Sequence, residues 1–417
     1  MYQAAGTDIV VIGGGSAGLC AAIAASRKGA RVILIERSGK LGGMGTLAKV
    51  HTFCGLYHPD VSRPPEIANP GLPAEIEQLM RARTGVDPVK MGKVFVLHQD
   101  PEIFAEIAHD LATSEKFLEL RFRTTCEAIT RTSEQTFIVK TNNGSITCTS
   151  LIDASADAIA ADLLGATRLS TPPEKNQRSA FVFSLQGIDP SAMEENFRMR
   201  LALEIVRAVT AGDLPQAALG TASRPSTVPG EIYFTTDLDP APRTELMASG
   251  LALANTLTEF LRKRFPAYAA AVGPFPADEP GVRETFRWKG RYLLTEQDLI
   301  TGRQFSDTVA YATWPIELRE TTRGAKLRFF DRAVPSCIPL RSLTSSEIEG
   351  IFFAGRCISA THEAIASVRV MGTCFATGQA AGHAAAAYVS SHIGEDSTST
   401  LAAENKNFID SRNEADD

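Results

Sequence analysis

The sequence lacks the features that mark several classes of protein. No apolar run reaches the ~18 residues of a membrane-spanning helix, and no Lys or Arg precedes Arg27, unlike the start of a signal peptide. The seven cysteines contain no C-x-x-C pair, which excludes the usual zinc and iron–sulfur spacings. Acidic residues (48) outnumber basic ones (42), so the net charge of −6 argues against a nucleic-acid partner. We therefore expect a cytoplasmic globular protein with free thiols and no metal.

What the chain does have is a glycine-rich turn between a short apolar run and a helix. Residues 8–12 read Asp-Ile-Val-Val-Ile, which is typical of a buried parallel strand. Three glycines then follow at the G-x-G-x-x-G spacing of a dinucleotide-binding turn. The first permits the turn, the second lets backbone approach a pyrophosphate, and the third lets helix and strand pack closely. The helix N-terminus would face the phosphates. The predicted nucleotide site therefore includes Gly13, Gly15, Ser16, Ala17 and Gly18.

A second apolar strand and a second glycine loop follow. Residues 31–35 are followed directly by Glu36, an acidic residue about 20 positions after the glycines, where ribose hydroxyls are held. Residues 41–46 read Leu-Gly-Gly-Met-Gly-Thr, too close to the first turn for another strand–helix unit. Such a loop lets backbone run along an extended cofactor, although a glycine-rich surface turn is the other interpretation. The further predicted contacts are Glu36, Arg37, Gly42, Gly43, Met44, Gly45 and Thr46.

The next hundred residues contain a proline-rich segment, a predicted helix and several predicted strands. Prolines dominate the first part of residues 59–95, which we expect to be a lid or insertion with a helix at 74–83. His51, Cys54 and His58 precede it as candidates for a site wall or for a covalent link to a cofactor. A helix is predicted over 100–115. A β-meander is predicted from strands at 118–122, 126–132, 136–141 and 145–149.

Residues 179–332 form the predicted substrate domain. Strands are expected at 180–185 and 231–236, and helices at 193–211 and 255–271, without a second G-x-G-x-x-G. We interpret this stretch as an inserted α+β domain with a mixed sheet. An α/β, Rossmann-like cofactor domain would comprise 1–58, 96–178 and 333–395, with 151–153 as a further parallel strand, a helix over 154–165, and 396–417 as a polar tail.

The last third of the chain carries the most specific pattern. It contains Pro280-Gly281-Val282-Arg283-Glu284-Thr285, Ile351-Phe352-Phe353-Ala354-Gly355-Arg356 and Gly378-Gln379-Ala380-Ala381-Gly382. In order and spacing, and together with the two glycine loops, these blocks resemble the FAD-dependent oxidoreductases of the glutathione-reductase-like flavoprotein superfamily. The resemblance covers both ends of the chain and residues 281–317, and it is weak over 186–275. It implies FAD held between two domains and redox chemistry on a substrate that it does not identify.

The resemblance also implies further contacts to FAD. The family's D-A-[ST]-G-D pattern reads Asp-Ala-Ser-Ala-Asp here, which retains Asp157 but puts Ala156 where glycine is usual. Gly355 and Arg356 would reach the cofactor after a strand at 350–354, although an acid often replaces the arginine in relatives. A helix from Met371 would direct the N–H groups of its first turn at the flavin. Those groups belong to Gly372 and Thr373.

The candidate catalytic residues are His362, Arg283, Arg369 and His51. An imidazole beside the flavin at position 362 suits proton transfer, or it only bonds backbone. Arg283, with Glu284 and Arg369, would anchor a substrate carboxylate or form a salt bridge between domains. Arg369 would otherwise stabilise reduced flavin or pair with Glu363.

We predict hydride transfer between FAD and a small organic substrate bound between the two domains. Because a second nucleotide motif is missing, a partner protein that supplies or accepts electrons is a further candidate. The alternatives are a non-redox flavoprotein, such as an isomerase or hydratase, and a structural or sensory use of FAD.

Overall fold

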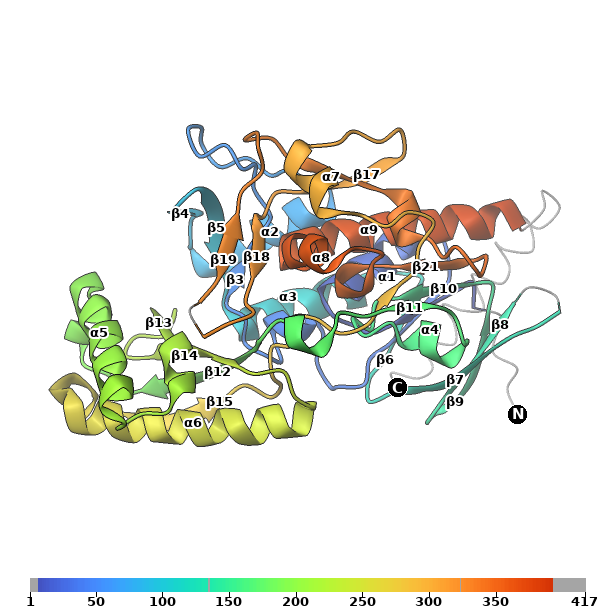
Figure 1. Cartoon of the computed structure of the whole chain (residues 1–417). Helices are drawn as coiled ribbons and strands as arrows, with labels where there is room; N and C mark the ends of the chain where they lie inside the picture. The colour runs from blue at the N-terminus through green and yellow to red at the C-terminus, as the bar shows by residue number, and fades with distance from the viewer. Residues whose placement is uncertain (1–6, 134–135, 323, 393–417) are drawn as a thin grey trace.

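A five-stranded parallel sheet places the first glycine turn at its carboxyl edge. The computed structural model of the chain describes residues 7–133, 136–322 and 324–392, and the strand order is β21-β10-β1-β2-β6 (Figure 1). Its four pairings are parallel. The strands are β1 (Ile9–Ile12), β2 (Val32–Ile35), β6 (Leu118–Arg121), β10 (Ser150–Asp153) and β21 (Ile351–Phe353). A parallel sheet in an α/β chain agrees with the predicted fold class.

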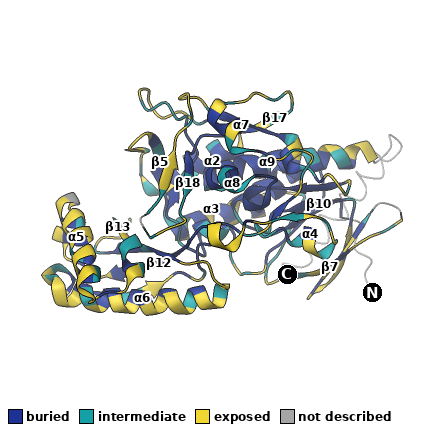
Figure 2. Ribbon diagram, in the orientation of Figure 1, coloured by how far each residue is buried: buried dark blue, intermediate teal, exposed yellow. Residues whose placement is uncertain are grey.

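Both faces of the sheet are covered, because its central strands are apolar at every position. β1 reads Ile-Val-Val-Ile and β2 reads Val-Ile-Leu-Ile, all buried. Ile9 and Val11 pack in one cluster with four helices, whereas Val10 and Ile12 pack in another with a small antiparallel sheet. Figure 2 shows this centre as the most buried part of the molecule. The four helices are α1 (Ser16–Arg27), α2 (Leu72–Thr84), α3 (Pro101–Thr113) and α9 (Met371–His392).

Small residues let α1 approach both the glycine turn and α9. A Cβ placed at Gly18 would stand 1.8 Å from the carbonyl oxygen of Gly13. One placed at Gly378 of α9 would stand 2.1 Å from the carbonyl oxygen of Ala17. Real Cβ atoms do not approach so closely, so side chains are excluded at both points. The predicted reason for the third glycine, close packing of helix on strand, is confirmed.

The antiparallel sheet on the other face is a three-stranded meander. It consists of β7 (Cys126–Arg131), β8 (Phe137–Thr141) and β9 (Gly144–Cys148). The prediction that residues 118–122 form its first strand is wrong, because that segment is β6 and pairs in parallel with β2. It follows α3, and a strand–helix–strand connection returns the chain parallel to the strand it left.

Two helix predictions also need correction. The helix expected over 154–165 is only α4 (Ile159–Leu163), because Ala156 and Ala158 have left-handed backbone, with φ of +69° and +52°. In the inserted part, the helix expected over 255–271 is α6 (Arg243–Arg264). It ends before Pro266, whose ring excludes helical backbone at the residue before it.

The inserted part is a second, antiparallel sheet covered by helices. The prediction of a mixed sheet is wrong, because its three pairings are all antiparallel. In Figure 1 this sheet and its helices form a lobe beside the main body, and Figure 2 shows the exposed outer faces of the two long helices. The strand order is β13 (Ala222–Pro225), β14 (Ile232–Leu238), β12 (Ser179–Gln186) and β15 (Val272–Pro276), with α5 (Glu195–Ala211) and α6 outside.

The core clusters divide the chain differently from the predicted domains, whose boundaries stay a prediction. Buried residues between Phe181 and Val282 form one cluster, whereas Trp288 packs with the parallel sheet and stacks on Phe353 at 5.2 Å. Leu72 and Met80, in the segment expected to be a lid, belong to the core around α1. The remaining elements are β3 (Thr52–Phe53), β4 (Val89–Met91), β5 (Val94–His98), β11 (Arg168–Leu169), β16 (Arg287–Trp288), α7 (Glu296–Thr301), β17 (Thr308–Ala312), β18 (Ile316–Leu318), β19 (Lys326–Arg328), β20 (Ser336–Pro339) and α8 (His362–Val368).

None of the helices in the described ranges combines the length and the apolar character that crossing a membrane requires. The seven cysteines are all free thiols, and five of them are buried.

The close approach of α1 predicts the effect of one added methyl group. Gly18→Ala would push its Cβ against the Gly13 carbonyl, so we expect a loss of about 1–3 kcal/mol or more in the free energy of unfolding. Gly39→Ala is the matched control, because the nearest atom to a Cβ there, Arg123 Nη2, is 3.9 Å away. Urea denaturation followed by circular dichroism measures both. Equal stability of the two variants would contradict the packing argument.

Candidate functional site

The turn after β1 is held by an acidic side chain and by the second glycine loop. Glu36 accepts hydrogen bonds from the backbone N–H groups of Gly14 (2.6 Å) and Ser38 (2.7 Å), one on each carboxylate oxygen. The N–H of Gly42 donates to the Gly14 carbonyl at 2.9 Å. Gly13 has a φ of +98°, the left-handed backbone that the predicted tight turn needs. The two loops are therefore one unit, because each bonds to the other.

A cavity of about 430 Å³ lies against both glycine loops and reaches the inserted sheet. Ala180, Val182 and Thr235 supply the wall from that sheet. The structure therefore brings most of the predicted site residues to one cavity, which both parts of the chain enclose. The predicted residues that line it are Gly13, Gly15, Ser16, Ala17, Glu36, Arg37, Gly43, Met44, His51, Asp157, Arg283, Gly355, Arg356 and Arg369.

Some predicted cofactor residues do not line the cavity but pack behind the residues that do. Besides Gly18, these are Gly42, Gly45 and Thr46. The Thr46 hydroxyl donates to the Leu41 carbonyl at 2.7 Å, which closes the second loop on itself. A Cβ at Gly45 would stand 2.8 Å from the ring of Phe104. These residues let the loop lie flat on α3.

Gly372 and Thr373 do not take the place that the resemblance implies. The N–H of Gly372 donates to the Cys54 carbonyl at 2.9 Å, and neither residue lines the cavity, whereas Met371 does. A Cβ at Gly372 would stand 2.5 Å from the carbonyl group of Gly55. The start of α9 therefore packs on the 54–56 loop, and this contact, not a cofactor, accounts for glycine at 372.

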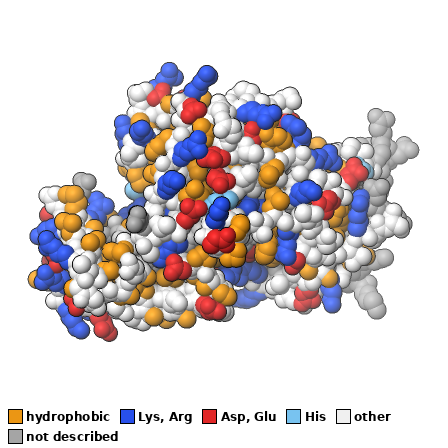
Figure 3. All heavy atoms as spheres, viewed as in Figure 1, with side chains coloured by type: hydrophobic (Ala, Val, Ile, Leu, Met, Phe, Trp, Pro, Cys, Tyr) orange, Lys and Arg blue, Asp and Glu red, His pale blue; other side chains and the backbone are white. Residues whose placement is uncertain are grey.

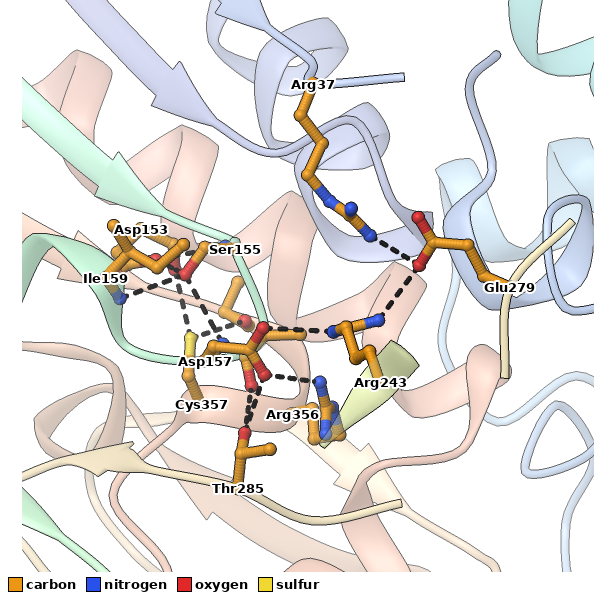
Figure 4. Close-up of polar contacts among 12 residues, drawn as sticks. Arg37, Asp153, Ser155, Asp157, Ile159, Arg243, Glu279, Thr285, Arg356 and Cys357 are labelled. Atoms are coloured by element: carbon orange, nitrogen blue, oxygen red, sulfur yellow. Dashed lines mark hydrogen bonds and ion pairs between the residues drawn. The ribbon is translucent and has the colours of Figure 1, made fainter. Parts of the chain in front are cut away.

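A chain of alternating charges crosses the cavity edge from the glycine loops to the inserted part (Figure 4). Arg37 and Arg243 both donate to Glu279, the latter at 2.9 Å. Asp157 then accepts from Arg243 at 3.1 Å and from Arg356 at 2.7 Å. Burial opposes ionisation of Asp157, but Arg356 and Arg243 outweigh it and hold the pKa of this carboxyl below its usual value.

Arg356 has donors left for a ligand. Its side chain is 7% exposed and lines the cavity, and within the described ranges its Nε and Nη1 have no hydrogen-bond partner. Ala156 beside it also lines the cavity, with its φ of +69°. This is the place where the family pattern has glycine, and the left-handed backbone explains that preference. Buried unpaired donors carry a free-energy cost that a bound anion would remove.

A second group of charged residues lines the cavity away from the glycine turn. Arg283 and Arg319 both bind Asp237, each at 2.8 Å. Arg319 also binds Glu317 at 2.7 Å, and burial raises the pKa of Glu317 less than Arg369 and Arg319 lower it, to about 2. Arg283 therefore forms a salt bridge inside the inserted part, and not the salt bridge between domains that was considered for it.

Arg369 does not pair with Glu363, which was one of the roles considered for it. Its Nη2 donates to the Gln177 side-chain oxygen and to the Glu317 carbonyl, both at 3.3 Å. Among the described residues it forms no ion pair with Glu363 or with any other carboxylate. Its Nε has no partner there either.

His51 and Cys54 line the cavity in uncharged forms, whereas His58 does not line it. Burial, and next the Arg224 guanidinium, lower the pKa of His51 to about 3. Its Nδ1 lies 3.1 Å from the Lys49 carbonyl, and its ring stacks on Tyr233 with centroids 5.2 Å apart. Burial, and next Glu317, raise the pKa of the Cys54 thiol. A weakly basic imidazole and a protonated thiol favour neither proton abstraction nor covalent attachment.

The structure places His362 outside the cavity, contrary to the prediction. Its Nδ1 lies 2.8 Å from Glu284 and its Nε2 lies 3.1 Å from Glu320. Glu284 also accepts from Arg287 at 2.6 Å. Burial lowers the pKa of His362, but the bond to Glu284 and its charge outweigh burial, so the pKa is raised. An imidazolium between two carboxylates is a structural ion pair at the start of α8.

Arg224, Arg243 and Arg319 are site residues that sequence reasoning missed. Arg224 and Arg243 lie in the stretch where the resemblance is weak, and Arg319 lies just after the matched residues 281–317. Only the fold brings them to the cavity. Groups of three or more His, Cys, Asp or Glu side chains that would suit a metal ion do not occur in the described ranges.

Comparison with known sequences agrees with this geometry. The family described as FAD dependent oxidoreductase matches residues 8–396, and the chain belongs to this family of flavoproteins. Its cofactor is FAD. None of the curated proteins compared with the chain matches it.

Several solved structures match the chain, all at low similarity. OxyS anhydrotetracycline hydroxylase from Streptomyces rimosus has 14% identity and a TM-score of 0.47, covering 95% of this chain and 65% of that one. The Diels-Alderase PyrE3 of pyrroindomycin biosynthesis has 13% identity and a TM-score of 0.45, covering 96% and 69%. PqsL, a probable FAD-dependent monooxygenase from Pseudomonas aeruginosa, has 12% identity and a TM-score of 0.40, covering 97% and 94%. Likeness at this level carries no argument about activity.

The glycine turn predicts how one substitution separates folding from cofactor binding. Gly15 lines the cavity with φ of −68°, and a Cβ there would be 3.9 Å from its nearest neighbour, Gly43 Cα. Gly15→Asp should therefore fold but repel a diphosphate, so we expect purified protein without FAD. Absorbance at the flavin band and the FAD released by acid measure this.

The control keeps the same charge change away from the cavity. Gly39→Asp lies in an exposed turn with open space around it, and it should keep FAD at the wild-type ratio. A full complement of FAD in Gly15→Asp would contradict the assignment of the turn to the diphosphate. A coloured pellet after acid precipitation would contradict the non-covalent attachment that the states of Cys54 and His51 favour.

The ion pair of His362 predicts a pH-dependent stability. A raised pKa in the folded protein means that this contribution is present below the unfolded pKa of about 6.5 and is lost as pH rises through the folded value. His362→Gln should therefore lower the melting temperature more at pH 6 than at pH 9, with FAD retained. His109→Gln, on the exposed side of α3, is the control. An equal fall in melting temperature at both pH values would show that the loss of stability does not come from the ion pair.

Proposed function

We propose that this chain moves a hydride between its FAD and a small organic molecule that enters the cavity between the parallel sheet and the inserted sheet. The observation that carries the proposal is the two-sided lining of the cavity, with the glycine loops on one side and β12 and β14 on the other. Small-molecule sites are concave and lie where two parts of a chain meet. When bound, FAD supplies a ring that accepts or donates a hydride.

Each group of residues has a stated role in this proposal. The first-turn N–H groups of α1 and the free donors of Arg356 bind the diphosphate. Glu36 is already oriented by the Gly14 and Ser38 N–H groups, so its remaining lone pairs are available to ribose hydroxyls. Val50 and Met44 give the cavity apolar wall and exclude water near the reacting atoms.

His51 and Cys54 line the cavity and are the candidates for proton transfer there. His362 is excluded by its place outside the lining and by its two carboxylate partners. His51 donates from Nδ1 to the Lys49 carbonyl, so its Nε2 is an acceptor, but a pKa of about 3 makes it a hydrogen-bond acceptor and not a strong base. Burial raises the pKa of the Cys54 thiol, so this group stays protonated and is only a weak acid.

Anaerobic mixing with candidate substrates tests the proposal. Organic acids, amines and alcohols are added in turn to the oxidised holoenzyme, and we expect at least one class to bleach the flavin band. NADPH and NADH form a second arm, and fast saturable bleaching is not expected, because the chain has no second dinucleotide motif. Fast reduction by NADPH would mean that the inserted part binds a nicotinamide cofactor.

The same assay separates redox chemistry from the alternatives. A flavin that no compound reduces, and that no unsaturated compound reoxidises after reduction with dithionite, would contradict hydride transfer. In that case the non-redox or structural uses of FAD would stand.

A further inference from the structure

The charges around the cavity are not evenly balanced. Near the glycine loops, Arg37, Arg243 and Arg356 are matched by Glu36, Asp157 and Glu279, three against three. Around Cys54 the balance differs, because four arginines meet two carboxylates, Asp237 and Glu317. We call these four the arginine cluster: Arg224, Arg283, Arg319 and Arg369.

The two carboxylates are already used within the cluster. Asp237 binds Arg283 and Arg319, and Glu317 binds Arg319. In the described ranges, Arg224 and Arg369 form no ion pair. The thiol of Cys54 interacts electrostatically with both of them, so the two unpaired cations face the same part of the cavity.

The hydrogen-bond partners of Arg224 are neutral. Its Nη1 donates to the Thr52 hydroxyl and, at 2.8 Å, to His98 Nδ1. Burial, and next Arg224, lower the pKa of His98 to about 4, so this imidazole carries no charge at neutral pH. The neighbouring Arg198 adds positive charge, and its Nε has no partner among the described residues. Nothing here neutralises Arg224.

Arg369 is also buried without an ion pair of its own among the described residues. Its two hydrogen bonds, both 3.3 Å long, go to a side-chain amide and a backbone carbonyl. Burial lowers its pKa to about 10, so it stays charged at neutral pH. Glu317 is the first carboxylate that acts on Arg369, but Arg319 also binds it. The next, Glu284, is held by Arg287 and His362. The carboxylates near Arg369 are therefore shared with other cations, and a bound anion would offset the cost of burying this guanidinium.

The outside of the molecule shows no such excess. On the face in Figure 3, basic and acidic side chains are interspersed without a large patch of one sign, and the whole chain carries −6. The cofactor's diphosphate belongs to the glycine turn and α1, where the charges already balance. The excess around Cys54 therefore calls for a second anion.

We propose that the arginine cluster binds the carboxylate of an organic acid, which is the substrate class of this flavoprotein, and that Arg224 determines this specificity. The proposal rests on the proposed function in one respect, since it assumes that the substrate occupies the cavity. Arg224 presents its guanidinium from β13 of the inserted sheet, while Arg369 presents its own from the end of α8. The uncharged His51 ring, stacked on Tyr233, gives the apolar part of the acid a flat wall.

Binding of acids and their amides to oxidised holoenzyme tests this inference. The probes are acetate, succinate and benzoate, each compared with the corresponding amide, at low ionic strength, by flavin difference spectra and calorimetry. We expect at least one acid to bind about tenfold to a hundredfold more tightly than its amide, the range of a charge-assisted hydrogen bond. Arg224→Gln should remove that difference and leave amide binding and FAD content unchanged. Arg224→Lys should keep most of it.

Arg207→Gln is the matched control, because it removes one positive charge from the exposed side of α5. It should leave every dissociation constant unchanged. Equal binding of acids and amides to the wild type, or an acid preference that survives Arg224→Gln, would overturn the inference, as would the absence of any acid binding. Because no turnover is needed, acid binding with a flavin that no compound reduces would refute the proposed function alone. Bleaching by a neutral substrate without acid preference would refute this inference alone.

Discussion

Backbone packed directly on backbone is the constraint on which this structure depends. At the turn after β1, Gly18 excludes a side chain because it meets the Gly13 carbonyl, and Gly43 because it meets Gly15 Cα at 2.8 Å. Gly355 closes the same region, with a Cβ position 2.8 Å from that of Ala17. Segments far apart in the sequence therefore converge without side chains between them. The wall that they leave includes the start of α1, whose first-turn N–H groups suit a diphosphate.

The two parts of the chain meet at this wall through ion pairs that differ in burial, and therefore in their contribution to stability. The Arg37–Glu279 pair is half exposed on the arginine side, so solvent screening leaves it little energy. Arg356 and Asp157 are more buried, at 7% and 25%, and there the loss of either partner would strand a charge. The cavity edge is thus held by its buried end, while its outer end can open at small cost.

Particular residues show where sequence reasoning was sufficient. Gly18 was interpreted correctly because its role depends on Gly13, five positions before it. The helix α3 was predicted correctly because Asp100 caps it through its own side chain. The residues that were wrongly placed at the cofactor, Gly372 and His362, depend instead on contacts with distant parts of the chain. Gly372 has the small size that a cofactor contact would need, but the same size serves a contact with Gly55, more than 300 positions away. His362 meets Glu284 and Glu320, and nothing near it in the sequence announces either partner.

The sequence by itself determined the cofactor class and the parallel sheet, because glycine spacing, strand apolarity and the acid after β2 act over short range and leave local patterns. The tertiary structure alone decided which cations share the cavity. Arg224, Arg319 and Arg369 come from three separate segments of the chain, and the neutralisation of their charges depends on which carboxylates reach them through the fold. Pairing of charges is a property of distance in space, and distance in space follows from the packing of the whole chain.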